Sequence, residues 1–222
     1  NAPFLSKEAL INKCQYFVDS GADMIDIGMA ADNAISFKGN SIRKQNEDLP
    51  QGLRFKFFMD KDYETLYAKQ GYTAVEVGVL AISEDYIGEN ELLLGGEYSY
   101  NDKTYYPVGG VVSEENYQYD ENDSDNVYFT AALINIGQKA SGKIDYSAYS
   151  KDIVVRAYTI YEDENGNRTI VYGKQQTANV FEVVYAILSA PQSDADKEAA
   201  ESAIVNCLDE YEAWVAENHP AA

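Results

Sequence analysis

The sequence has 222 residues with 17 basic and 37 acidic side chains, a formal net charge of −20 at pH 7, and 45% apolar residues. This charge disfavours nucleic acid and anionic membranes as partners, because both are themselves negative. The apolar content suffices for a packed core, yet no apolar stretch approaches the roughly 20 residues that a membrane helix needs. We therefore expect one folded domain over residues 1–222, with no nucleic-acid partner and no membrane insertion.

Residues 1–33 are expected to form a helix and a lead-in to the rest of the domain. Ser6 can cap a helix over residues 7–19, and Gly21 follows it as a stop. Leu10 and Phe17 lie on one face of this helical pattern. The helix is therefore amphipathic and should pack against another element.

Residues 34–173 are predicted to form an antiparallel β-sandwich. Leu53, Phe55 and Phe57 alternate with charged residues, as is typical of strands with one buried face. Val75, Val77 and Val79 alternate in the same way with Glu76 and Gly78. The predicted strands are residues 34–43, 53–59, 74–82, 105–112, 126–136, 152–161 and 168–172.

Two local signals lie between the strands. Asn165–Gly166 predicts a β-hairpin with a two-residue type I′ turn, because both central positions of that turn need positive φ. A short helix over residues 63–69, between Asp62 and Gly71, is expected to cross an open end of the sandwich.

Residues 174–217 change to a helical period and are predicted to form two helices. Pro191 separates them, and Ser193 with Asp196 approximates a capping box that opens the second. The predicted fold is therefore mainly β (α+β), an antiparallel β-sandwich with an N-terminal helix and two C-terminal helices packed on it. The apolar stripes are Val180, Phe181, Val184, Ile187 and Leu188 in the first C-terminal helix, and Ile204, Cys207, Leu208, Tyr211 and Trp214 in the second.

One histidine and two cysteines limit the chemistry of the chain. His219 lies close to the end of the sequence, where a fraying terminus does not hold a catalytic base in place. Histidine-dependent triads and histidine-rich zinc sites are therefore not expected. Cys14 and Cys207 each lie on the apolar side of a helical pattern, so two interpretations stay open: two buried thiols, or a disulfide between the terminal helices.

Several short motifs follow one another in a recognisable order: Gly39-Asn-Ser-Ile-Arg43, Gly52-Leu-Arg-Phe55, Val75-Glu-Val-Gly78, Tyr128-Phe-Thr-Ala-Ala-Leu133 and Arg156-Ala-Tyr158. Together they resemble a β-sandwich module that recurs in large cell-surface and secreted proteins of gut Firmicutes, beside immunoglobulin-like repeats, dockerins or glycan-degrading domains. The resemblance spans about residues 34–188. It implies an extracellular or cell-surface location close to polysaccharide, and it brings no catalytic residues.

Three charged residues of these motifs, Arg54, Glu76 and Arg156, lie on strands whose alternate residues are apolar, so they could share one face. Charge pairing would offset the cost of removing them from water. Two interpretations stay open: a structural ion network or solvated strand face, and a polar cluster for a sugar hydroxyl or carboxylate.

A tyrosine-rich segment, residues 96–126, is the best candidate for a binding site. Its tyrosines are interleaved with acidic and amide side chains. Sugars need aromatic rings for their C–H faces and such polar partners for their hydroxyls. The alternative is that these tyrosines pack half-buried on a sheet, as is common in strands. The candidate ligand-binding residues are Tyr98, Tyr100, Tyr105, Tyr106, Tyr117 and Tyr119.

The acidic stretch that follows places Asp120, Asn122 and Ser124 at the alternate spacing of a calcium loop. Asp125 and Ala131 stand where an EF-hand needs glycine and glutamate, so an EF-hand is excluded. These three residues are candidate ligands of a nonstandard calcium site, and the alternative is a solvated acidic loop.

Three functions stay open. The expected one is a non-catalytic module that binds a polysaccharide or oligosaccharide. The second is a structural or protein-adhesion module of a surface protein, whose sandwich edges could pair with a partner strand. The third is a carboxylate-dependent glycoside hydrolase, but nothing selects a pair among the 37 acidic residues, and no nucleophile or nucleotide motif occurs. We therefore expect no enzymatic activity.

Overall fold

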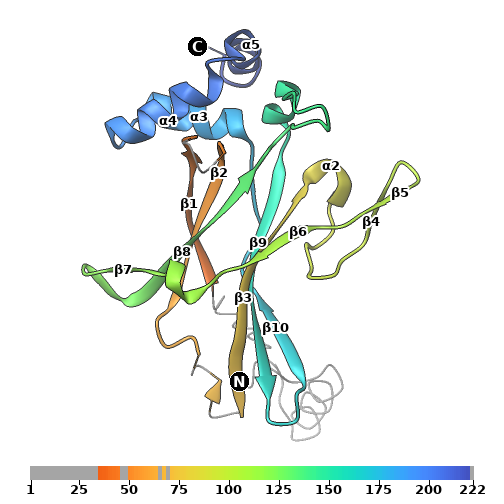
Figure 1. The fold of residues 1–222 in the computed structure, drawn as a ribbon, viewed down its shortest axis with the longest axis vertical. Coiled ribbons are helices and arrows are strands. Elements are labelled where there is room, and N and C mark those ends of the chain that lie inside the picture. The colour runs from red at the N-terminus through yellow and green to blue at the C-terminus, as the bar shows by residue number, and fades with distance from the viewer. Residues whose placement is uncertain (1–34, 46–49, 65–66, 69–70, 221–222) are drawn as a thin grey trace, which may run out of the picture.

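The computed structural model describes residues 35–45, 50–64, 67–68 and 71–220 (Figure 1). The expected N-terminal helix and Cys14 lie outside these residues. Of the predicted helix over residues 63–69, the described residues form turns, with Ala68 in 3₁₀ conformation, and no regular α-helix. None of the helices in the described ranges is long and apolar enough to span a membrane.

Two antiparallel sheets form the body of the molecule, and the predicted β-rich α+β fold is confirmed. They pack face to face, because the residues of their inner faces belong to one apolar cluster. Sheet A has the order β1 (Ile35–Arg43), β2 (Gly52–Asp60), β8 (Asp123–Ile134) and β7 (Gln118–Asp120). Sheet B has the order β10 (Arg168–Tyr172), β9 (Ile153–Asp163), β3 (Tyr72–Ser83) and β6 (Val108–Val111), and β11 (Gln176–Ala178) also pairs with β9.

The inner faces follow the predicted alternation in most places. Leu53, Phe55 and Phe57 of β2 are buried in the core, as predicted. In β3, Val77 and Val79 are buried but Val75 is exposed. The register with β9 shifts between Ala74 and Glu76, so a bulge takes Val75 out of the alternation.

The predicted hairpin between β9 and β10 is confirmed, but its predicted turn type is wrong. Glu162 pairs with Arg168, and the backbone N–H of Gly166 donates to the carbonyl of Asp163 (3.0 Å). Gly166 has φ 80°, whereas Asn165 is not in the left-handed region. The Asp163 carboxylate accepts the N–H of Asn165 (2.9 Å), which favours a longer loop with a single left-handed glycine over the two-residue type I′ turn.

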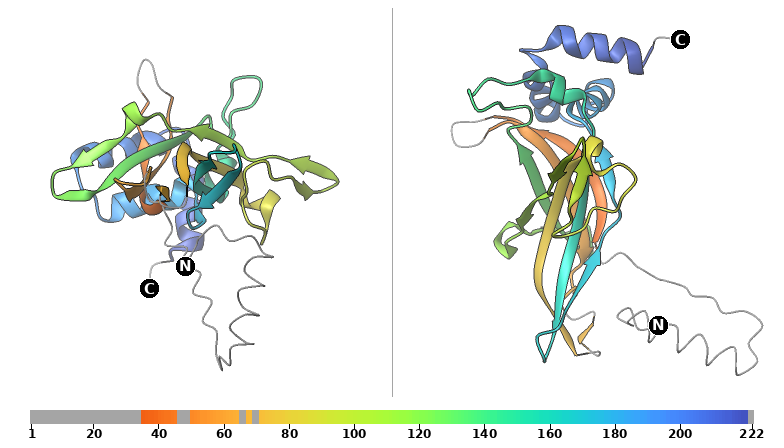
Figure 2. Two further views of the ribbon diagram at one scale, coloured as in Figure 1. Left: turned by 90° about the horizontal axis from the view of Figure 1, so that it is seen from below. Right: turned by 90° about the vertical axis from the view of Figure 1, so that its right-hand side faces the viewer.

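Three helices, not the predicted two, close one end of the sandwich (Figure 2). They are α3 (Val180–Ser189), α4 (Asp194–Ile204) and α5 (Leu208–Asn218). Ser193 caps α4 as predicted, since its side chain accepts the N–H of Asp196 (3.1 Å). The predicted second helix breaks before Cys207, the buried N-cap residue of α5. The break lets Tyr211 and Trp214 pack on Phe181 of α3, at ring distances of 5.6 and 5.9 Å.

An arm projects from sheet B, and we define it as residues 84–107. It contains α2 (Glu84–Ile87) and a small hairpin of β4 (Tyr98–Tyr100) and β5 (Lys103–Tyr105). The predicted strand over residues 105–112 is wrong, because it divides into β5 of the arm and β6 of sheet B. Pro107, which has no N–H for a strand ladder, lies at the division.

Candidate functional site

The structure divides the six candidate tyrosines into two groups that lie on opposite sides of the molecule (Figures 1 and 2). The arm carries four of them. The other two follow the short 3₁₀ helix η2 (Glu114–Asn116): Tyr117 precedes β7 and Tyr119 lies within it. The arm group is Tyr98, Tyr100, Tyr105 and Tyr106, and the β7 group is Tyr117 and Tyr119.

The tip of the arm is a tight turn at Asn101–Asp102. Both residues have positive φ, 49° and 59°, which asparagine and aspartate tolerate better than most residues. Tyr100 and Lys103 pair on either side of the turn. An Asn-Asp pair flanked by alternating tyrosines is a hairpin signal, but no hairpin was predicted here.

Tyr98 anchors the arm and is not available to a ligand. It is buried, its hydroxyl accepts the N–H of Leu93 (2.8 Å), and it donates to the carbonyl of Glu91 (2.7 Å). Its ring belongs to a second apolar cluster, between the arm and the outer face of sheet B. The arm is therefore a packed part of the fold.

Arg156 also holds the base of the arm. Its Nε donates to the carbonyl of Gly173 (2.8 Å), and its Nη1 lies 3.3 Å from both the carbonyl of Leu92 and the Glu91 carboxylate. The guanidinium carbon lies 4.5 Å from the ring centre of Tyr172. Arg156 thus joins sheet B to the arm through charged hydrogen bonds, a structural role.

The prediction that Arg54, Glu76 and Arg156 share one face is wrong for Arg54. Glu76 and Arg156 both lie on the outer face of sheet B, where Glu76 accepts the Tyr158 hydroxyl (2.7 Å). Arg54 lies on β2 of sheet A, where the buried neighbours Leu53 and Phe55 direct it outward on the other side of the molecule.

Four aromatic rings give the arm two faces. On one face, Tyr86 of α2 stacks on Tyr105 with ring centres 3.8 Å apart and planes 12° apart. Tyr100 lies 5.6 Å from Tyr86 and is 40% exposed. On the other face, Tyr106 is 60% exposed, and its hydroxyl lies 3.4 Å from an oxygen of the Glu97 carboxylate. Tyr86 lies outside the predicted segment, and only the fold brings it to the hairpin.

The β7 group has less exposed aromatic surface for a ligand than the arm. Tyr117 is half-buried against Phe129, with ring centres 6.2 Å apart, and accepts a hydrogen bond from Tyr63 (3.4 Å). Burial raises the pKa of Tyr117 above its ordinary value. Tyr119 is 77% exposed. A single exposed ring beside β7 is a poorer platform than the ring cluster of the arm.

The candidate calcium residues lie at and beside the turn between β7 and β8: Asp120 ends β7, Asn122 is in the turn, and Ser124 is in β8. Asp120 accepts hydrogen bonds from the backbone and side chain of Asn122 (2.9 and 3.2 Å). The carbonyl of Ser124 accepts from Lys61 Nζ (2.9 Å), which lies 3.7 Å from the Asp125 carboxylate. Within the described residues, no three His, Cys, Asp or Glu side chains are grouped to hold a metal. Calcium binding here stays a prediction.

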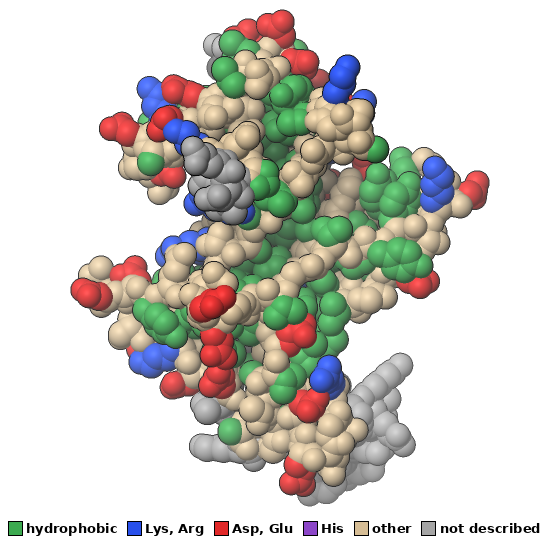
Figure 3. Space-filling view, viewed as in Figure 1, with side chains coloured by type: hydrophobic (Ala, Val, Ile, Leu, Met, Phe, Trp, Pro, Cys, Tyr) green, Lys and Arg blue, Asp and Glu red, His purple; other side chains and the backbone are tan. Residues whose placement is uncertain are grey.

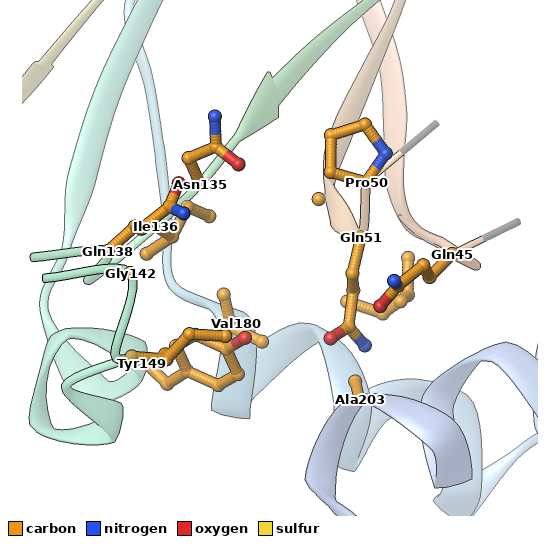
Figure 4. A pocket seen from close by; sticks show the side chains of 13 residues that line it. Gln45, Pro50, Gln51, Asn135, Ile136, Gln138, Gly142, Tyr149, Val180 and Ala203 are labelled. Carbon is orange, nitrogen blue, oxygen red and sulfur yellow. The ribbon is translucent and has the colours of Figure 1, made fainter. Parts of the chain in front are cut away.

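A small pocket lies between the end of the sandwich and the helices (Figure 4). Amides of Gln51, Asn135 and Gln138 line it with the ring of Tyr149, and the buried Gln51 Nε2 has no hydrogen-bond partner among the residues that the structure describes. Its volume is about 180 Å³, below the roughly 300–1,000 Å³ of typical ligand pockets. A cavity of this size and polarity suits ordered water rather than a sugar chain.

His219 and Cys207 are both held in place at the helical end. The fraying expected at His219 is wrong, because its ring stacks on Tyr185 (3.8 Å between centres) and its Nε2 lies 3.1 Å from the Glu182 carboxylate. Cys207 is buried and forms no disulfide within the described residues, which do not include Cys14, and burial raises its pKa to about 11. Both residues serve helix packing, and the thiol is a poor nucleophile at neutral pH.

Comparison with family models, with curated proteins and with solved structures finds no match to this chain.

Proposed function

We propose that the chain is a non-catalytic carbohydrate-binding module of an extracellular or cell-surface protein, and that the arm is its contact surface. The observation that carries the proposal is the exposed ring of Tyr106 beside the Glu97 carboxylate on an anchored hairpin. An aromatic face packs on the C–H groups of a sugar, and a carboxylate at its rim accepts sugar hydroxyls.

The second face of the arm supports the same proposal. Tyr100 is exposed beside the stacked rings of Tyr86 and Tyr105. Because Tyr98 and Arg156 anchor the hairpin, little conformational entropy is lost when these rings meet a ligand. The arm therefore suits a weak, preorganised contact with an extended polymer.

The charge of the chain favours neutral polymers. A protein of net charge −20 repels acidic polysaccharides, and the arm adds Glu97 and Asp102 close to the exposed rings. Starch, xyloglucan and β-glucan are therefore better candidates than pectin. The extracellular location rests on the motifs that resemble Firmicutes surface modules.

Affinity electrophoresis against soluble starch, xylan, xyloglucan, β-glucan and pectin tests the proposal. We expect at least one neutral polymer to retard the protein. Tyr106→Ala should weaken binding about fivefold, since an aromatic contact contributes on the order of 1 kcal/mol. Tyr100→Ala should have a similar effect.

Tyr119→Ala is the matched control, because Tyr119 is more exposed than Tyr106 but lies on the other side of the molecule. It should leave retardation unchanged. Failure of every polymer to retard the protein would overturn the proposal. So would a loss of binding in Tyr119→Ala with none in Tyr106→Ala or Tyr100→Ala.

A further inference from the structure

An apolar slot opens on one side of the sandwich, between β6 of sheet B and β8 of sheet A. Its volume is about 580 Å³, within the range of ligand-binding clefts. Ala81, Gly110 and Ala131 are small, which leaves this space between the sheets. The floor and walls include the core residues Phe55, Val79, Val155 and Leu133.

The slot is bordered by two strand edges that no other strand within the described ranges pairs with. β7 pairs with β8 only as far as Tyr128, so residues 129–134 have a free edge, and β6 ends the order of sheet B. The segment Phe-Thr-Ala-Ala-Leu-Ile contains no charge and no proline, the usual protections of an exposed edge.

The opposite side of the sandwich is closed. A Cβ atom on Gly173 would lie 2.8 Å from the carbonyl oxygen of Ile35, so the backbones of the two sheets approach closely there. The two sheets are therefore close together on this side, and the slot is confined to the side of β6 and β8. In Figure 3, hydrophobic side chains gather over the central strands on the open side, with acidic side chains beside them.

We propose that the slot receives an extended strand of a different protein. The strand pairs with the free edge of β8 and continues the line of β7, and its alternate side chains fill the space above Phe55 and Val79. This binding surface is separate from the arm, so it does not depend on the proposed carbohydrate binding.

Charge indicates the kind of partner. Residues 113–126, whose Asn116 and Gln118 line the slot, contain six acidic residues and no basic one. A strand with lysine or arginine at its ends is complementary to this border. A second copy of the chain is disfavoured, because each copy carries a net charge of −20.

Selection from a displayed library of random 12-residue peptides on the full chain tests the proposal. We expect enriched peptides to alternate apolar and polar residues and to carry Lys or Arg at their ends. N-methylation of alternate amides in such a peptide should weaken binding at least tenfold, because it removes the donors for strand pairing.

Gly110 provides graded variants that fill the slot. Gly110 pairs with Val79, whose side chain faces the core, so a side chain at position 110 would point into the slot. A Cβ there would meet no atom within 4 Å, so a side chain is accommodated. Gly110→Leu should weaken peptide binding at least tenfold and Gly110→Ala by less, with the thermal midpoint unchanged. Tyr106→Ala should bind peptides normally, which separates the slot from the arm.

Three outcomes would overturn the proposal. One is a selection that enriches no peptide with apolar alternation. The second is equal binding of enriched peptides by Gly110→Leu and the unchanged protein. The third is a dimer, detected by sedimentation, that Gly110→Leu dissociates, which would assign the slot to a second copy.

Discussion

The outer faces of the two sheets differ, although their inner faces share one core. On sheet B, Val154 and Ile160 of β9 belong to a buried apolar cluster to which Leu92 and Tyr98 of the arm contribute. On sheet A, the outer face is covered by its own long side chains, with Lys56 Nζ 4.9 Å and Lys38 Nζ 5.7 Å from the ring centre of Tyr128. The central strand β9 of sheet B is therefore buried on both faces, whereas β2 of sheet A is buried on one.

The sequences of the strands β2 and β9 already indicate this difference. β2 alternates apolar and charged residues, as a strand with one wet face does. β9 reads Ile-Val-Val-Arg-Ala-Tyr-Thr-Ile-Tyr, an almost continuous apolar run. Such a run in an antiparallel sheet indicates that something covers the second face, and here the cover is the arm that carries the candidate site.

The largest expected effect comes from removing side-chain volume on the covered face. Ile160 is 5% exposed and Ile134, on the outer face of sheet A, is 38% exposed. We expect Ile160→Ala to lower the free energy of unfolding by about 2–5 kcal/mol, and Ile134→Ala by at most about 1 kcal/mol. Urea denaturation measures both. Equal losses would mean that the arm does not cover sheet B in solution.

A smaller effect is expected where the arm is tied to sheet B. Arg156→Met keeps the apolar stem but removes the hydrogen bonds to Gly173 and Leu92. Its cost should be about 2 kcal/mol, with faster hydrogen exchange in the arm. Arg54→Met, on the exposed face of sheet A, should stay within about 0.5 kcal/mol. If the two variants behave alike, Arg156 does not anchor the arm.

The smallest effects concern two tyrosines on the two outer faces. Burial is the main cause that raises the pKa of Tyr158, and Glu76 adds to it. A hydrogen bond to Asp123 is the main cause that raises the pKa of Tyr128 to about 12. We expect Asp123→Asn to lower the pKa of Tyr128 toward its ordinary value. Glu76→Gln should leave the pKa of Tyr158 raised, as NMR of ring-labelled tyrosine would measure.

The raised pKa of Tyr158 makes the stability of the protein depend on pH. A phenol whose pKa rises on folding ionises first in the unfolded chain, so the stability that it contributes is complete below pH about 10 and is lost above it. The free energy of unfolding should therefore fall as the pH rises above 10, and less steeply in Tyr158→Phe. An unchanged slope in that variant would show that Tyr158 is not desolvated in the folded state.

Much of the fold followed from local patterns. The alternation in β2, the hairpin before β10 and the Ser193 cap depend on neighbouring residues, so sequence reasoning could find them. The break before Cys207 was missed because it depends on a partner far along the chain, Phe181 of α3. The division at Pro107 had a local signal, since proline cannot donate to a strand ladder, but the pairing of β6 with β3 depends on residues far apart in sequence.

The candidate site was predicted only in part. Composition singled out Tyr100 and Tyr106, which are exposed on the arm, but it also grouped them with Tyr117 and Tyr119, which lie across the molecule. Closeness in sequence did not become closeness in space, because β6 and η2 carry the chain from one sheet to the other between the two groups. Tyr86 could not be recognised, since nothing local links it to Tyr105.

By itself, the sequence determined the β-rich class, the acidic surface and the supply of tyrosines, because periodicity, charge and composition are properties of the chain. Tertiary structure alone decided which tyrosines are anchors and which are free, where Arg156 forms its hydrogen bonds, and that one side of the sandwich stays open. Those outcomes depend on which strand lies beside which, and strand order in a sheet is set by the packing of residues far apart in sequence.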